Sequence, residues 1–255
     1  MLLAVDIGNT NVTLGVFDGE QLRATWRMTT NVNQMADEYA ALMLNLLHHQ
    51  GLDTSDIKEI AFCGVVPPLQ ATFEELFQRY FHISPLLVGP GVKTGVRIRM
   101  DNPKEVGTDR IVNAAAAHHL YSGAVIVVDI GTATTFDTVS KEGDYLGGAI
   151  ATGIGTAAEA LFARAAALPR VELVRPEHAI GTNTITAMQS GIVFGYVGLI
   201  EGIVARIKQE LGEKATVVAT GGYAELVARE TAVIDRVNPN LTLIGLRLIY
   251  LMNKV

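Results

Sequence analysis

The feature that most constrains the fold of this chain is a short pattern that occurs twice. The first copy reads Leu3-Ala-Val-Asp-Ile-Gly-Asn-Thr-Asn-Val-Thr13, and the second reads Ile126-Val-Val-Asp-Ile-Gly-Thr-Ala-Thr-Thr-Phe-Asp137. In both, an apolar run typical of a buried strand ends in Asp-Ile-Gly and is followed by hydroxyl and amide side chains. A repeat at this separation predicts two structurally similar halves. Two such strands could direct the carboxylates of Asp6 and Asp129 into one cleft between the halves.

Each copy has the residue types of a phosphate-binding turn. Gly8 and Gly131 allow backbone torsions that are closed to other residues and let a ligand approach closely. The neighbouring Thr and Asn side chains lie beside turn N–H groups, which can bind phosphate oxygens, and Asp suits a hard cation that accompanies a nucleotide. The alternative is a pair of ordinary hairpin turns in which Asp and Asn satisfy the local backbone. Two copies with the same order of residue types favour the phosphate interpretation.

Composition narrows the class of protein. The chain has 255 residues, of which 49% are hydrophobic and 18% charged, so it can bury a sizeable core. Its net charge of -6 disfavours a general nucleic-acid binder, which would normally be basic. Cys63 is the only cysteine, which excludes an intrachain disulfide and fits a reducing cytosol. No secretory signal is evident, and the most apolar stretch, 190–207, is interrupted by Glu201 and Arg206. We therefore expect a cytoplasmic protein without a membrane or nucleic-acid partner.

Hydrophobic periodicity predicts an alternation of strands and helices. Strands are expected at 22–28, 60–66, 86–88, 124–128 and 216–219, and helices at 36–48, 69–80, 111–120, 157–167 and 190–211. We expect two domains, residues 1–118 and 119–255. Glycines at 191, 195, 198 and 202 fall on one face of the longest predicted helix. Because each mid-helix glycine costs about 1 kcal/mol relative to alanine, another backbone should pack closely there, from this chain or from a second subunit.

Two further segments carry candidate chemistry. In the segment 101–110, Gly107 permits a bend just before Asp109 and Arg110. Asp109 could be a helix N-cap, or it could be a general base that takes a proton from a substrate hydroxyl while Arg110 binds a substrate anion; the residues alone leave both open. Thr220-Gly-Gly222 follows an apolar strand and suits a turn against which a nucleotide lies, although a lone Gly-Gly pair is a weak signal.

Taken together, these elements resemble the actin-like ATPase superfamily, which includes hexokinase, Hsp70 and actin. Within it, the chain most resembles the type III pantothenate kinases. The resemblance extends over nearly the whole chain, and its ordered set of motifs is specific: Asp6-Ile-Gly-Asn-Thr-Asn11, Val65-Val-Pro-Pro68, Val88-Gly-Pro-Gly91, Asn102-Pro103, Glu105-Val-Gly107, Asp109-Arg-Ile-Val-Asn113, Val128-Asp-Ile-Gly-Thr-Ala-Thr-Thr135, Gly147-Gly148, Glu159-Ala-Leu161, Asn183-Thr184, Met188-Gln-Ser-Gly191 and Thr220-Gly-Gly222.

The resemblance implies a duplicated actin-like ATPase (ribonuclease H-like) α/β fold, with two similar domains and a cleft between them. It also implies ATP-dependent phosphorylation of pantothenate to 4'-phosphopantothenate, the first step of coenzyme A biosynthesis, with Mg²⁺ and a monovalent cation, K⁺ or NH₄⁺. A homodimer with its active site at the interface is implied as well.

The resemblance also assigns residue roles. The ATP phosphates would be bound by Asp6, Ile7, Gly8, Asn9, Thr10, Asn11, Val12 and Thr13, with Asp6 organising Mg²⁺ through water and Thr132 touching ATP. Asp109 would be the catalytic base and Asp129 would help hold the monovalent cation. Pantothenate would be bound by Gly107, Thr108, Asp109 and Arg110, by Thr184 across the dimer interface, and at the position of Met100.

The chain departs from the family pattern at two places. Met100 stands where many members have a tyrosine that contacts the substrate, and methionine cannot donate a hydroxyl hydrogen bond. Thr152-Gly153 stands where the family usually has Pro-Gly. Two alternatives stay open: a non-catalytic regulator with the same fold, and a kinase or polyphosphate hydrolase of the superfamily that acts on another substrate.

Overall fold

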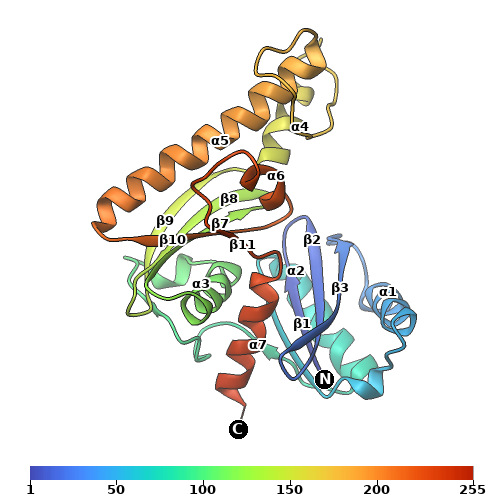
Figure 1. Ribbon diagram of the computed structural model, residues 1–255. Helices are drawn as coiled ribbons and strands as arrows, with labels where there is room; N and C mark the ends of the chain where they lie inside the picture. The colour runs from blue at the N-terminus through green and yellow to red at the C-terminus, as the bar shows by residue number, and fades with distance from the viewer. Residues whose placement is uncertain (255) are drawn as a thin grey trace. The chain divides into compact units, whose positions relative to one another are not determined.

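Each copy of the repeated pattern contains a central strand of one sheet, and the matching strands of the two sheets have the same order (Figure 1). The computed structural model describes residues 1–254. The first sheet has the order β3-β2-β1-β4-β5 and the second has the order β11-β10-β7-β8-β9-β6. The strands are β1 Leu2–Ile7, β2 Asn11–Asp18, β3 Gln21–Thr29, β4 Glu59–Gly64, β5 Leu86–Leu87, β6 Arg97–Ile98, β7 Ala124–Ile130, β8 Ala133–Val139, β9 Asp144–Thr152, β10 Ala215–Thr220 and β11 Arg236–Val237.

The two sheets match strand for strand. In the first, β1 pairs antiparallel with β2, β2 antiparallel with β3, and β1 parallel with β4, which is parallel to β5. In the second, β7 to β11 repeat this scheme, and β6 is added at the edge beside β9. The predicted pair of similar halves is therefore confirmed in the topology.

The helices follow the hydrophobic periodicity, but those predicted over 111–120, 157–167 and 190–211 begin earlier, at residues 108, 154 and 184. They are α1 Ala36–His49, α2 Pro67–Leu76, α3 Thr108–Leu120, α4 Ile154–Arg164, α5 Thr184–Leu211, α6 Ala224–Ala228 and α7 Leu241–Asn253, with short helical turns at Thr54–Asp56 and Pro103–Glu105. The helix predicted over 69–80 ends instead in a π-helical turn, Phe77–Phe81, which buries both of those rings. Helix α7 was not predicted; its sequence is predominantly apolar, and such a short run does not by itself distinguish a buried helix from a buried strand.

The chain divides into two compact units. The first unit contains Met1–Gly95, Asn102–Ala116 and the C-terminal segment from Thr242, and the second contains Val96–Asp101 and Ala117–Leu241. The division predicted from the sequence, 1–118 and 119–255, stays a prediction about the duplicated halves.

In the first unit, the sheet places the Asp6 side chain on the face that α7 covers. Strand alternation puts Leu3, Val5 and Ile7 in the core cluster that contains buried residues of α1 and α2. The opposite face carries Ala4 and its cross-strand partner Gly15, where an added Cβ would lie 2.8 Å from a methyl carbon of Leu243 in α7. Asp6 alternates with the core residues and so belongs to this second face.

In the second unit, α5 packs along one face of the sheet (Figure 1). Buried residues of β7 contribute to the core on this side, together with Val197, Ile200 and Val204 of α5. Asp129 points to the other face, because it alternates with the core residues Val128 and Ile130. The two aspartates of the repeated pattern thus occupy equivalent positions, each at the end of the first strand of its sheet.

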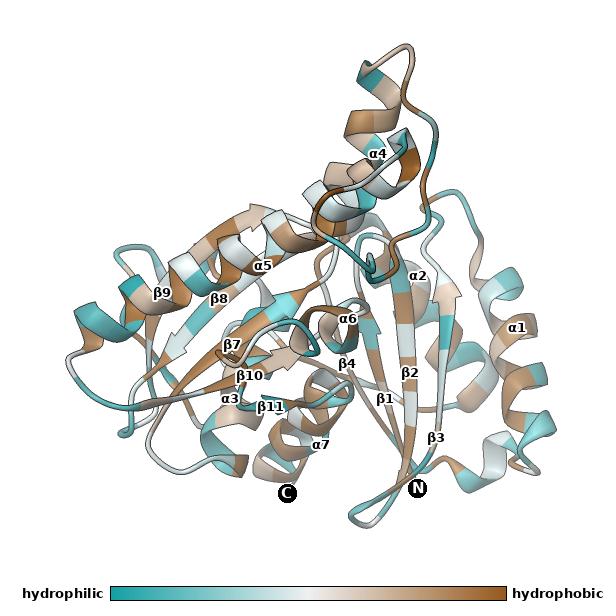
Figure 2. Ribbon diagram, turned by 45° about the horizontal axis from the view of Figure 1, so that its top comes forward, coloured by the Kyte–Doolittle hydropathy of each residue, from teal (hydrophilic) through white to brown (hydrophobic). Residues whose placement is uncertain are grey.

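Helix α5 also bears on the question of a membrane. Among the described residues, it is the one helix of at least 18 residues that is long and apolar enough to cross a membrane, by length and composition alone. No membrane span was expected here, because Glu201 and Arg206 interrupt the apolar run. A mean hydropathy over 18 residues tolerates these two charged residues. Core helices pass this test too, and α5, whose ribbon carries both hydrophobic and hydrophilic residues (Figure 2), contributes to the core of the second unit.

Candidate functional site

The first Asp-Ile-Gly turn joins β1 to β2 and presents polar side chains to solvent. The Gly8 N–H donates to the Asn11 carbonyl at 3.0 Å, and a Cβ at Gly8 would lie 3.0 Å from that same oxygen. Thr30, which directly follows β3, holds the turn in place. Its hydroxyl donates to the Gly8 carbonyl at 2.7 Å, and its backbone N–H donates to the Thr10 carbonyl at 2.9 Å. The side chains of residues 9–11 are exposed, whereas Ile7 and Val12 are buried at either side.

The second turn, in the second unit, is one residue shorter. Ile130 pairs directly with Thr134, whereas Ile7 pairs with Val12. The carbonyl of Thr132 accepts the Gly153 N–H at 3.1 Å and the Thr156 hydroxyl at 2.8 Å, so the start of α4 lies on this turn.

The packing of Gly153 bears on the departure at Thr152-Gly153, where the family usually has Pro-Gly. A Cβ at this position would lie 2.2 Å from the Gly131 carbonyl oxygen, so no other residue fits without moving the turn. The glycine of the expected Pro-Gly pair is kept, and it is the residue that the packing requires.

The Gly-Gly turn lies directly against Asp129, in the second unit. Gly221 has a φ of +94°, and a Cβ there would lie 2.6 Å from both the Asp129 Oδ1 and the Ile130 carbonyl oxygen. The Tyr223 N–H donates to the same Ile130 carbonyl at 3.3 Å. Two oxygen atoms therefore converge on the space that only a glycine leaves open. The sequence identified the two segments separately, and the structure brings them together.

In the first unit, Asp109 lies within the first turn of α3. The helix begins at Thr108, so Asp109 is inside the helix and does not precede it as an N-cap. Its Oδ1 accepts the backbone N–H of Arg110 at 2.8 Å. A Cβ at Gly107 would lie 2.5 Å from this Oδ1, so the glycine makes room for the carboxylate. The Thr108 hydroxyl donates to the Gly64 carbonyl at 3.2 Å and ties the start of α3 to the end of β4.

A buried thiol links Asp6 to this group. Strands β1 and β4 pair in parallel with Asp6 opposite Cys63, and the Cys63 Sγ lies 3.4 Å from the Asp6 Oδ1. Burial raises the pKa of the Cys63 thiol well above its usual value, and the negative charges of Asp6 and Asp109 raise it further. The negative charges of both carboxylates therefore raise the pKa of the same thiol.

Cys63 is a candidate site residue that was not predicted from the sequence, where the single cysteine indicated only the redox compartment. The available signal was the predicted strand over 60–66, whose end at Cys63-Gly64 resembles the end of the first strand at Asp6.

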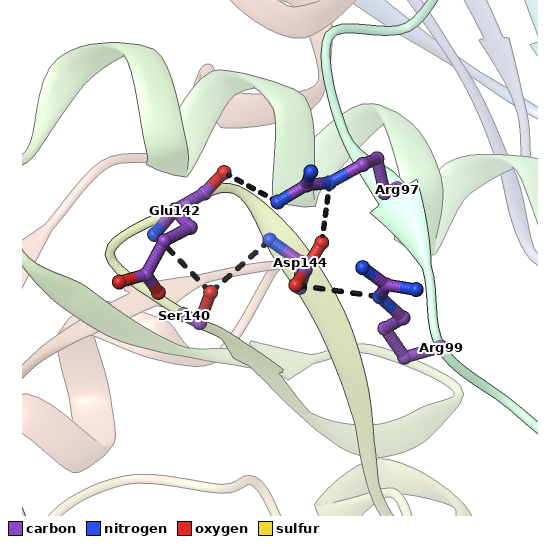
Figure 3. A network of polar contacts seen from close by, with 5 residues as sticks. All are labelled: Arg97, Arg99, Ser140, Glu142 and Asp144. Carbon is purple, nitrogen blue, oxygen red and sulfur yellow. Dashed lines mark hydrogen bonds and ion pairs between the residues drawn. The ribbon is translucent and has the colours of Figure 1, made fainter.

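Met100 lies in the second unit, just after β6, with its sulfur 2.9 Å from the position of a Cβ on Gly147. Figure 3 shows how β6 is held to β9: Arg97 Nε and Arg99 Nε contact the two carboxylate oxygens of Asp144 at 2.6 and 3.3 Å. Desolvation alone would raise the pKa of Asp144, but the two guanidinium groups outweigh it and lower that pKa. These ion pairs hold β6, which ends shortly before Met100, against β9.

Thr184 is the first residue of α5 and lines an apolar cavity of about 990 Å³ in the second unit. Asn183 caps the helix, with its side chain accepting the Thr186 N–H at 2.9 Å. The cavity is lined by Ala151, Thr152, Ala157, Leu161, Leu168, Thr184, Ala187, Met188, Gly191, Ile192, Gly195, Tyr196 and Leu199.

The glycine stripe of α5 opens onto space. Apart from its chain neighbours and the nearby backbone of α5 itself, a Cβ at Gly191, Gly195 or Gly198 would meet no atom of residues 1–254 within 4 Å. The expectation that a backbone of this chain packs closely along the stripe is therefore wrong for these three positions, and the possibility of a second subunit remains.

Metal ligands are sparse. Over residues 1–254, no group of three or more His, Cys, Asp or Glu side chains is placed to hold a metal ion. A divalent ion at Asp6 would need most of its oxygen ligands from water and from a bound phosphate group, which is how Mg²⁺ commonly binds.

Comparison with known proteins gives consistent results. A family model described as type III pantothenate kinase matches residues 2–206. A type III pantothenate kinase of Dehalococcoides mccartyi strain CBDB1 is 58% identical over 254 residues, which cover 100% of this chain and 97% of the relative.

Solved structures show the fold alone. One described as a Baf family transcriptional activator from Campylobacter jejuni has a TM-score of 0.62 at 20% identity and covers 98% of both chains. An inorganic polyphosphate/ATP-glucomannokinase from Arthrobacter sp. strain KM has a TM-score of 0.50 at 12% identity and covers 99% of both chains. Together with the matched sheets, these likenesses confirm the expected duplicated actin-like ATPase fold class.

The Gly221 turn allows a matched test of its packing on Asp129. Gly221→Ala should lower the free energy of unfolding by about 2–4 kcal/mol, because the new methyl group meets two oxygen atoms and the backbone is left-handed. Gly222→Ala is the control, since a Cβ there meets nothing within 4 Å among the described residues, and it should change stability by less than about 0.5 kcal/mol. Urea unfolding of both variants measures the difference; equal stabilities would contradict the packing.

Proposed function

The chain belongs to the type III pantothenate kinase family, and we infer from this membership and from the site geometry how its residues carry out the reaction. The enzyme transfers a phosphoryl group from ATP to pantothenate and forms 4'-phosphopantothenate, at the start of coenzyme A biosynthesis. The observation that carries the residue assignments is the cluster in the first unit: Asp6 contacts Cys63 of β4, and the Thr108 hydroxyl ties the start of α3, which carries Asp109, to the carbonyl of Gly64 at the end of the same strand.

We assign the ATP phosphates to the first turn. Phosphoryl transfer depends mostly on positioning and on stabilising negative charge. The residues proposed to bind the phosphates are Asp6, Ile7, Gly8, Asn9, Thr10, Asn11, Val12 and Thr13, and the exposed side chains of residues 9–11 support this. Asp6 would hold Mg²⁺ through water, and the ion would supply charge neutralisation on the phosphates. Thr132 of the second turn is proposed to touch ATP.

Asp109 is the proposed general base. It would accept the proton of the pantothenate hydroxyl as that oxygen attacks the γ-phosphorus of ATP. The room that Gly107 leaves for the Asp109 carboxylate supports this role. Arg110 would bind the pantothenate carboxylate, for which a guanidinium group is well suited. Thr108 would line the same pocket, although its hydroxyl also holds α3 to β4.

Asp129 is the proposed ligand of a monovalent cation. Its Oδ1 and the Ile130 carbonyl oxygen both lie beside Gly221, and carboxylate and carbonyl oxygens are the kind of donor that suits K⁺. A partly buried carboxylate beside a carbonyl also gains from a neighbouring positive charge. The chemistry of this donor pair supports the cation site.

Pantothenate is also proposed to contact Met100 and Thr184. Methionine can pack against the acceptor but cannot replace the hydrogen bond of a tyrosine hydroxyl. Thr184 would reach the pantothenate bound to a second copy of the chain. The open glycine stripe and the apolar cavity at Thr184 support a homodimer through α5, because a second helix could approach closely there.

The alternatives have less support. A non-catalytic regulator has no physical need for Asp109 and Asp129, and the likeness to a Baf family activator concerns the fold alone. A kinase for another acceptor would be expected to differ in the segment 105–110, which carries the family motif here. We propose a cytoplasmic enzyme without a nucleic-acid or membrane partner.

The decisive assay of the proposed function is phosphorylation of pantothenate by the purified chain with ATP and Mg²⁺, in K⁺ and in Na⁺. We expect turnover that falls at least tenfold when Na⁺ replaces K⁺, and Asp129→Asn should reduce this dependence on K⁺. Equal turnover in the two salts would remove the cation site but keep the kinase. No turnover in either salt, with sugars and polyphosphate tested beside pantothenate, would contradict the proposed function.

The base assignment has a direct test. Asp109→Asn should lower kcat at least about 100-fold, because general-base catalysis typically contributes that much. The fold should remain, as judged by circular dichroism and the urea midpoint. Asp18→Asn, which also removes one carboxylate but at an exposed position at the end of β2, is the control and should keep full activity. Turnover near the wild-type value in Asp109→Asn would rule out its role as base.

The dimer proposal can be tested on the glycine stripe. Gly195→Phe should fill the space that a second helix would occupy, so we expect monomers in sedimentation experiments and a loss of turnover. Glu210→Phe places the same side chain at an exposed position of α5 outside the cavity, and it should leave both properties unchanged. A Gly195→Phe variant that stays dimeric, or that is monomeric and fully active, would count against a shared active site.

A further inference from the structure

We propose that Cys63 is a positioning residue for phosphoryl transfer, and that its S–H group donates a hydrogen bond to the Asp6 Oδ1 and so fixes the orientation of that carboxylate. The proposal rests on the proposed function, because it gives Asp6 a role in organising ATP and Mg²⁺. No other thiol could take this part, since Cys63 is the only cysteine of the chain.

The backbone leaves Cys63 little freedom. It faces Asp6 in the parallel pairing of β4 with β1, and its side chain is fully buried. The Val65 N–H donates to the Ile7 carbonyl at 3.1 Å, which continues the pairing just beyond the two residues. A Cβ at Gly64 would lie 3.1 Å from the Ile7 Cβ, so the strands are close at this point. The sulfur is therefore held beside Asp6 by the sheet itself.

The position of the sulfur makes the thiol a donor to Asp6. Its Sγ lies 3.4 Å from the Asp6 Oδ1, within reach of a hydrogen bond to sulfur. A cysteine thiol is ordinarily protonated at neutral pH, so the sulfur carries a hydrogen that it can donate. A protonated thiol has one hydrogen to give, and the Asp6 carboxylate is an acceptor within reach.

Donation and packing make different demands on the side chain. A carboxylate beside ATP and Mg²⁺ must present its oxygens in one orientation, and loss of a bond to a charged group lets it turn. Serine keeps a donor of nearly the same size, whereas alanine and valine remove it. If Cys63 only fills space, an apolar replacement should serve as well as serine.

The test compares Cys63→Ser with Cys63→Ala and Cys63→Val in the full-length enzyme. We expect Cys63→Ser to stay within about threefold of wild-type kcat and of the Mg²⁺ concentration for half-maximal turnover. The two apolar variants should lose about tenfold in kcat or require about tenfold more Mg²⁺, with little change in the KM for pantothenate. Unfolding midpoints of the three variants control for a loss of fold.

Two outcomes would overturn the proposal. The first is an alanine or valine variant with wild-type kcat and Mg²⁺ dependence. The second is a serine variant as impaired as alanine at equal stability, since this would show that donation is not what matters.

A second measurement does not depend on activity. The S–H stretching band in the infrared reports on a single group here, and we expect it at lower frequency in the native protein than in the unfolded chain, because the S–H is hydrogen-bonded. A native band at the unfolded position would overturn the proposal even if a variant failed to fold. If wild type does not phosphorylate pantothenate, the proposed function fails, and the Mg²⁺-ATP affinities of the serine and alanine variants then decide the role of the thiol.

Discussion

Parallel pairing of two strands is the constraint on which both candidate clusters depend. In the first unit β1 lies parallel to β4, and in the second β7 lies parallel to β10. Parallel strands end at the same edge of a sheet, so whatever follows one of them meets whatever follows the other. Each aspartate of the repeated pattern is therefore paired with a residue of the neighbouring strand that stands just before a glycine.

The pairs are Asp6 with Cys63, ahead of Gly64, and Asp129 with Thr220, ahead of Gly221. The equivalent positions have diverged in chemistry. Beside Asp6 stands a buried thiol, and the Gly64 carbonyl holds the start of α3 through Thr108. Beside Asp129 the chain turns at Gly221, and the space that a side chain would take there is bounded by the Asp129 Oδ1 and the Ile130 carbonyl oxygen. We propose that one cluster of this duplicated frame organises phosphates and a base, and that the other holds a cation.

Glycine serves two opposite purposes in this molecule. Gly107, Gly153 and Gly221 each stand where a side chain would collide with a carboxylate or a carbonyl of the same unit. Gly191 and Gly195 in α5 instead open onto an apolar cavity. The first group lets the chain pack against itself at the site, and the second leaves room that nothing in residues 1–254 fills, which supports a second copy as the occupant.

The sequence by itself determined the duplication, most of the strands and helices, and the family motifs, because these depend on residue order and on short-range periodicity. Only the tertiary structure decided that Cys63 meets Asp6, that the Gly-Gly turn meets Asp129, and that Gly153 lies on the second turn. It also showed that α7 completes the first unit and that α2 ends in a π-helical turn. These contacts join residues that are distant in the chain, and local pattern cannot specify them, because they arise only when the strands pair in register.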